Sequence, residues 1–68
     1  MVIAVLTENK RLIGRHPTTG RPVAATLFKG NRHRVVQCDD HRVIIESAID
    51  GTTFETPWRG IRILAKEE

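Results

Sequence analysis

The sequence has little of what disulfide-linked, secreted or membrane-spanning proteins need. It contains no tyrosine, one tryptophan and one cysteine, Cys38, so no disulfide can form within the chain. The apolar run at residues 1–6 is far shorter than the about 20 residues of a membrane helix. It also lacks the basic leader and cleavage site of a signal peptide. We therefore expect a protein of the reducing cytoplasm with no membrane association.

Acidic residues are missing from one stretch of the chain. Between Asn9 and Cys38 there are none, although seven lysines and arginines fall there. From Asp39 onward seven acidic residues outnumber four basic ones, and the net charge is +3. Such asymmetry is typical of proteins that bind polyanions, nucleic acids above all. Basic side chains that only keep a small surface soluble would leave the same pattern.

The length limits the organisation of the protein. At 68 residues the chain is expected to form one domain, residues 1–68, with no room for separate catalytic and binding units. Domains of this size bury a small core and often gain stability by pairing with a second copy. A homodimer is therefore a further expectation.

Turn residues recur at short intervals between runs rich in Val, Ile, Leu, Thr and Phe. This pattern predicts an all-β protein, a small antiparallel meander curled into an SH3-like or OB-like half-barrel. The last run, residues 61–68, fits either a strand or a short C-terminal helix, and a strand is favoured.

Specific turns predict the pairing of these strands. Asp50-Gly51 suits a two-residue type I′ hairpin turn, which pairs Ile49 with Thr52, Ser47 with Phe54, Ile45 with Thr56 and Val43 with Trp58. Two-residue turns at Gly30-Asn31 and Asp39-Asp40 extend the same inner face to Val23, Ala25, Leu27, Val36 and Cys38. A further hairpin is expected to join residues 2–7 to residues 11–14. Arg34 also falls on the inner face, which requires either a place at the rim or a longer second turn.

The sequence contains no recognisable catalytic or metal site. Cys38 and His41 flank two aspartates, but a structural zinc site uses four ligands in two pairs and the second pair is missing. We expect Cys38 to pack in the core and His41 to cap a turn. The predicted register sets Glu46 opposite Glu55, where the two carboxylates either share a proton, are neutralised by neighbouring arginines, or mark a register error. No cofactor and no enzymatic activity are expected.

Basic residues interleaved with planar side chains form the candidate binding surface. The loop at residues 14–22 carries Arg15, His16 and Arg21, and Phe28 is predicted to face His33 beside the 30–31 turn. Planar groups stack on bases while guanidinium groups contact phosphates. We therefore predict a small basic module that binds RNA or DNA, mainly through phosphates, with nine candidate residues: Arg15, His16, Arg21, Phe28, Lys29, Arg32, His33, Arg34 and Arg42.

A protein-interaction module is the alternative. Phe28, Val35 and Ile44 would then form an exposed apolar centre, and the arginines its rim, because arginine is enriched at interface hot spots. Such a module would act as an adaptor, an inhibitor or a subunit of an assembly.

Overall fold

Short apolar runs ended by turn residues form seven β-strands. The structure is a computed structural model that describes residues 2–66, and it contains no helix within that range, hence none that could cross a membrane. The strands are β1 (Val2–Leu6), β2 (Lys10–Arg15), β3 (Pro22–Leu27), β4 (Arg32–Cys38), β5 (Arg42–Glu46), β6 (Thr53–Pro57) and β7 (Ile61–Lys66).

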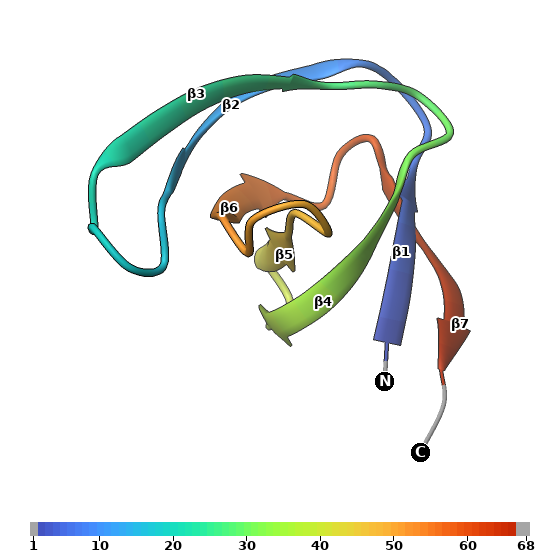
Figure 1. Cartoon of the computed structure of the whole chain (residues 1–68). Coiled ribbons are helices and arrows are strands. Elements are labelled where there is room, and N and C mark those ends of the chain that lie inside the picture. The colour runs from blue at the N-terminus through green and yellow to red at the C-terminus, as the bar shows by residue number, and fades with distance from the viewer. Residues whose placement is uncertain (1, 67–68) are drawn as a thin grey trace.

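All seven strands belong to one antiparallel sheet with the order β3-β2-β6-β5-β4-β1-β7. The sheet curls on itself and leaves β3 and β7 as its two edges (Figure 1). The predicted fold class, a small all-β half-barrel, is confirmed. The C-terminal run forms a strand over the described residues 61–66, and the rest of that prediction lies outside them.

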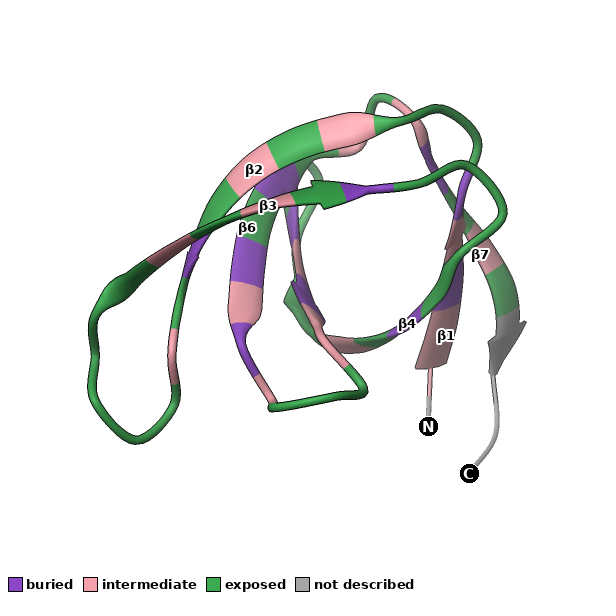
Figure 2. Cartoon of the chain, turned by 45° about the horizontal axis from the view of Figure 1, so that its top comes forward, coloured by how far each residue is buried: buried purple, intermediate pink, exposed green. Residues whose placement is uncertain are grey.

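The concave side of the sheet holds the core. Its buried apolar residues are contributed by strands from both halves of the sheet: Ala4, Leu6, Leu27, Val43, Ile45, Phe54 and Ile61. Half-buried residues such as Leu12, Val35 and Trp58 pack against them. Buried or half-buried positions alternate with exposed ones along β6 and the first half of β4 (Figure 2), as expected for strands with one side in the core and one in water.

The hairpin between β5 and β6 forms where predicted, but its register differs. Ile45 pairs with Phe54 and Val43 with Thr56, a shift of two residues from the expected pairing. The cause is a longer turn, since the Ser47 N–H donates to the Thr52 carbonyl at 2.8 Å and leaves four residues in the loop. A shift of two preserves which side chains face inward. Glu55 consequently lies opposite Ile44, and the predicted facing of Glu46 and Glu55 is wrong.

The strand β4 presents the opposite face from the one predicted over much of its length. The Asp39 N–H donates to the Arg42 carbonyl at 2.9 Å, so the turn residues are 40 and 41, one position later than expected. The register also shifts beside Val36, which forms a bulge. The later turn shifts the register by two residues and keeps the predicted face, whereas the bulge turns His33 and Val35 inward and Arg34 outward. Cys38, expected in the core, is exposed at the strand end.

Two predicted hairpins do not form. The strand β1 pairs with β4 and β7 instead of β2, and β3 pairs only with β2, so residues 28–31 form a connection between distant strands. That connection is held by the first strand, because the Gly30 N–H donates to the Leu6 carbonyl at 2.8 Å. The Thr7 N–H donates to the Gly60 carbonyl at 2.9 Å. Turns far apart in sequence therefore meet at one end of the barrel.

Candidate nucleic-acid interface

Three arginines gather on the outer side of the neighbouring strands β4, β1 and β7. Val5 pairs with Arg32 on one side and with Arg62 on the other. Directly paired residues share a face, so both side chains point away from the core, about 10 Å apart at two strand spacings. Arg34, two residues along β4, pairs with Ile3 on the same side. We call Arg32, Arg34 and Arg62 the arginine face.

Few carboxylates neutralise this face. Arg34 has Glu46 at 3.8 Å, a loose and exposed ion pair that contributes little to stability in water. Neither Arg32 nor Arg62 has an ion-pair partner among the side chains that the structure describes. Among the described side chains, two of the three guanidinium groups therefore have no carboxylate partner.

The 28–31 connection lies at the start of β4, next to the arginine face in sequence. Its fold is fixed by short hydrogen bonds: the Lys29 N–H donates to Asn9 Oδ1 at 2.8 Å, and the Asn31 N–H donates to the Phe28 carbonyl at 3.0 Å. Phe28 is 56% exposed, unusual for a large apolar side chain in so small a protein. The connection thus presents an aromatic ring and the exposed Lys29 close to Arg32.

The predicted loop around His16 lies elsewhere. It joins β2 to β3 at the Pro22 end of β3, whereas the 28–31 connection leaves the Leu27 end, and Figure 2 shows the loop far from β1 and β7. His16 Nδ1 accepts the Thr18 N–H at 3.2 Å, so this ring supports the loop itself. Arg15 donates to the Gly20 carbonyl at 3.3 Å, and Arg21 is exposed nearby. The two basic loops that carry the nine predicted residues therefore do not converge on one face, as a single binding surface built from all nine would require.

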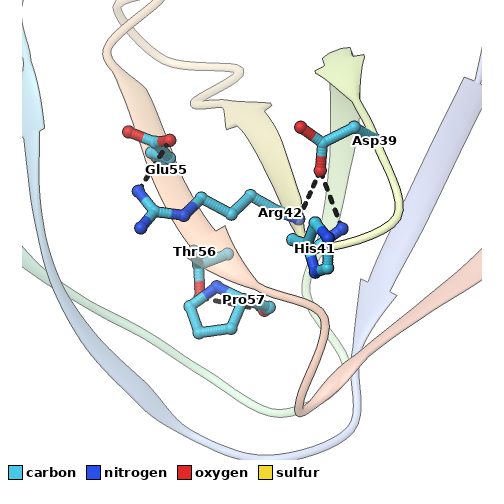
Figure 3. A network of polar contacts seen from close by, with 6 residues as sticks. All are labelled: Asp39, His41, Arg42, Glu55, Thr56 and Pro57. Atoms are coloured by element: carbon cyan, nitrogen blue, oxygen red, sulfur yellow. Dashed lines mark hydrogen bonds and ion pairs between the residues drawn. The ribbon is translucent and has the colours of Figure 1, made fainter.

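Two other predicted residues are also engaged. His33 is only 8% exposed, with its ring on the core side, and it does not face Phe28 on the outer surface. Arg42 does lie on the outer side, but its guanidinium donates to Glu55 Oε1 at 3.1 Å (Figure 3). Of the nine predicted residues, Phe28, Lys29, Arg32 and Arg34 follow one another along the 28–31 connection and the first part of β4.

The turn after β4 is capped by an aspartate instead of a histidine. Asp39 Oδ1 accepts the backbone N–H groups of His41 at 2.7 Å and Arg42 at 2.8 Å (Figure 3). These hydrogen bonds, that of His41 first, hold the pKa of Asp39 below its ordinary value of 3.8. The Thr52 N–H does the same for the pKa of Asp50 in the β5–β6 loop. Within residues 2–66 no three His, Cys, Asp or Glu side chains are grouped as a metal site requires.

Arg62 is the member of the face that the sequence prediction missed. It stands between Ile61 and Ile63, and this alternation in an edge strand points the arginine outward. The sequence alone indicates that Arg62 points outward. That Arg62 lies near Arg32 follows only from the pairing of β7 with β1, which the sequence did not predict. Comparisons with protein-family models, with characterised proteins and with solved structures find no match to this chain.

Proposed function

We propose that this protein is a binding module for single-stranded nucleic acid, RNA or DNA, and that the arginine face contacts its phosphates. The observation that carries the proposal is the outward row of Arg32, Val5 and Arg62 with Arg34 beside it. Guanidinium groups bind phosphate through two parallel hydrogen bonds, which suits arginine better than lysine for this task. The protein acts by binding, without a catalytic step.

The exposed Phe28 gives this surface a second kind of contact. An aromatic ring beside cationic side chains lets a base stack while the adjacent phosphate is neutralised. Every base has a planar face, so such stacking favours unpaired strands over duplex and discriminates weakly among sequences. The apolar side chains of Ile3 and Val5 lie between the arginines and support the same preference.

The outer-face version of the protein-interaction alternative has less support. It needs Val35 at its apolar centre, and Val35 instead packs against the core. Only Phe28 of that proposed centre is strongly exposed, since Ile44 is partly covered. The exposed position of Phe28 is already explained by its proposed role in stacking on a base. It therefore does not call for a protein partner on the outer face.

Salt dependence tests the mechanism. Neutralising phosphates with three arginines releases counterions, and for single strands the slope of log K against log salt is about −0.7 for each contact, or about −2 in all. Affinity for a fluorescent oligonucleotide should then fall about 20-fold between about 50 and about 200 mM salt. An affinity that is unchanged across this range would refute phosphate-driven binding.

Paired variants locate the surface. The double variant Arg32→Ala/Arg62→Ala should lower affinity at all sequences and reduce the salt slope by about two-thirds, to one remaining contact. The control Arg15→Ala/Arg21→Ala removes the same charge from the far loop. It should leave the slope of log K against log salt largely unchanged. If the control loses binding and the first variant keeps it, the surface is misassigned.

A third variant tests stacking. Phe28→Ala should weaken binding of a single strand about 5- to 100-fold, as expected for loss of one stacked base, with no change in salt slope. The exposed position of Phe28 means that the fold should tolerate the change. Equal binding of single strand and duplex by the native protein would contradict this part of the proposal.

A further inference from the structure

The edge strand β3 lacks the features that normally keep a sheet edge from pairing with another chain. Such edges are blunted by charged residues, by bulges or by covering segments. The other edge strand, β7, contains Arg62 and has a register irregularity. In contrast, β3 has the sequence PVAATL, without a charged residue, and pairs regularly with β2 along its whole length. Its proline stands at the first position only.

A cleft runs along the free side of this strand. It has a volume of about 460 Å³ and lies between β3, the 28–31 connection, the start of β4 and the β5–β6 loop. Both the inward Ala25 and the outward Thr26 border it, and no described residue of β2 does, so the cleft reaches the unpaired edge. Its walls are largely apolar, and Ile49 at its rim is 96% exposed.

A buried histidine borders the cleft with an unused hydrogen-bonding atom. His33 Nδ1 lies 3.2 Å from the Glu46 carbonyl oxygen, which can only accept, so Nδ1 carries the proton. In the neutral ring Nε2 is then an acceptor. Nε2 is buried and has no hydrogen-bond partner among the described residues. Buried polar atoms are normally paired, and a ligand's donor group would complete this one once the side chains that cover it move aside.

From these three features we infer that the cleft binds an extended peptide of a partner protein, which adds a strand to β3 and inserts a tyrosine or tryptophan side chain toward His33. Strand addition satisfies the unpaired edge through main-chain hydrogen bonds, and a side-chain pocket supplies specificity. The pocket has apolar walls and an acceptor, which together match an aromatic body with a donor at its tip. This site is distinct from the arginine face, but Arg32 and Phe28, both part of the proposed nucleic-acid surface, also border the cleft.

The occupant is a different protein rather than a second copy of this chain. The sequence has no tyrosine. Its one tryptophan, Trp58, packs against the core and donates its Nε1–H to the Asp39 carbonyl at 2.7 Å. A copy of the chain therefore has no side chain of the required kind to offer. Hydrogen-bond complementarity thus selects a heterologous peptide.

Selection from a displayed library of short random peptides tests the inference, because it requires no identified partner. The recovered peptides should converge on one tyrosine or tryptophan within an extended, uncharged segment. Replacing that tyrosine with phenylalanine in a synthetic peptide should weaken binding about fivefold, the effect of one lost hydrogen bond. Recovery of no peptide above background, or of peptides without an aromatic donor, would overturn the proposal.

Variants of exposed isoleucines place the site on the protein. Ile49→Asp should abolish binding of the selected peptide, and Ile13→Asp, the same change at a 72% exposed position outside the cleft, should leave it unchanged. Methylating alternate peptide nitrogens should abolish binding in one of the two alternating sets, because only one set faces the β3 edge. Equal tolerance of both sets would exclude strand addition.

The outcome is distinguishable from that of the proposed function. Ile49→Asp should leave oligonucleotide binding intact, and Arg34→Ala/Arg62→Ala should leave peptide binding intact, because neither arginine borders the cleft. Because Phe28 and Arg32 border the cleft as well, the native protein is expected to show some competition between peptide and oligonucleotide. Loss of both peptide and oligonucleotide binding in a folded Ile49→Asp variant would show one shared site and refute the separate cleft.

Discussion

Adding one methyl group at Gly14 should destabilise the protein more than any exposed substitution. Gly14 is buried where β2 meets β6, and the ring of Phe54 lies against it. A β-carbon at this position would stand 2.7 and 2.8 Å from Phe54 Cδ1 and Cε1, and would also collide with the Thr53 carbonyl oxygen. Such distances are well inside van der Waals contact, so the strand or the ring must move.

The size of this destabilisation depends on which of the neighbouring atoms can move. Phe54 is among the most buried residues of the core, and the Thr53 carbonyl belongs to the backbone, so neither can rotate away cheaply. Overpacking a core position costs typically about 1–3 kcal/mol, and we expect Gly14→Ala to reach about 3 kcal/mol. For a domain of this size that corresponds to a decrease in Tm of about 12–24 °C.

Thermal unfolding followed by circular dichroism measures this effect, with Gly20→Ala as the matched control. Gly20 has a φ of 70°, and a β-carbon there would meet nothing within 4 Å, so alanine adds only backbone strain, about 1 kcal/mol. A Gly14 variant that is no less stable than the Gly20 variant would refute the packing of Phe54 against β2.

Three further measurements test the polar contacts of the fold. The low pKa of Asp39 means that its carboxylate stabilises the folded state above pH 3.8, and that this contribution disappears as the pH falls below that value. The Asp39→Asn variant lacks this contribution. Its Tm should therefore decrease less than that of the native protein between about pH 5 and about pH 2. Trp58→Phe removes the Nε1–H donor to the Asp39 carbonyl and should cost about 1 kcal/mol in urea unfolding. Thr56→Val should cost about 1 kcal/mol in the same assay, since Thr56 is buried and its hydroxyl donates a hydrogen bond to the Pro57 carbonyl.

The sequence predicted the fold class because period-two patterns and turn residues act locally. The β5–β6 hairpin illustrates both the strength and the limit of such signals. Asp50-Gly51 marked the turn correctly, but not its length, which depends on the bond between Ser47 and Thr52. The inner face survived the error because an even shift keeps every side chain on its side of the sheet.

Pairing between strands distant in sequence was beyond these local signals. The Gly30-Asn31 pair has the composition of a hairpin turn, yet β3 and β4 separate, and β4 pairs with β1 instead. That choice depends on the whole core, since Ala4, opposite His33, is completely buried.

The sequence identified only part of the candidate site, because that site also depends on pairing between strands that are distant in sequence. Along β4 the order Arg32, His33, Arg34, Val35 alternates charged with less polar side chains, which by itself puts both arginines outside. The assumed hairpin overrode this pattern and turned His33 outward. The alternation along the strand was the more reliable signal. If His33 and Val35 faced outward, the guanidinium groups of Arg32 and Arg34 would be buried. The small core could not supply hydrogen-bonding partners for them. The same alternation in β7 exposes Arg62, so the arginine face results from two strands that each satisfy this constraint and are brought together by β1.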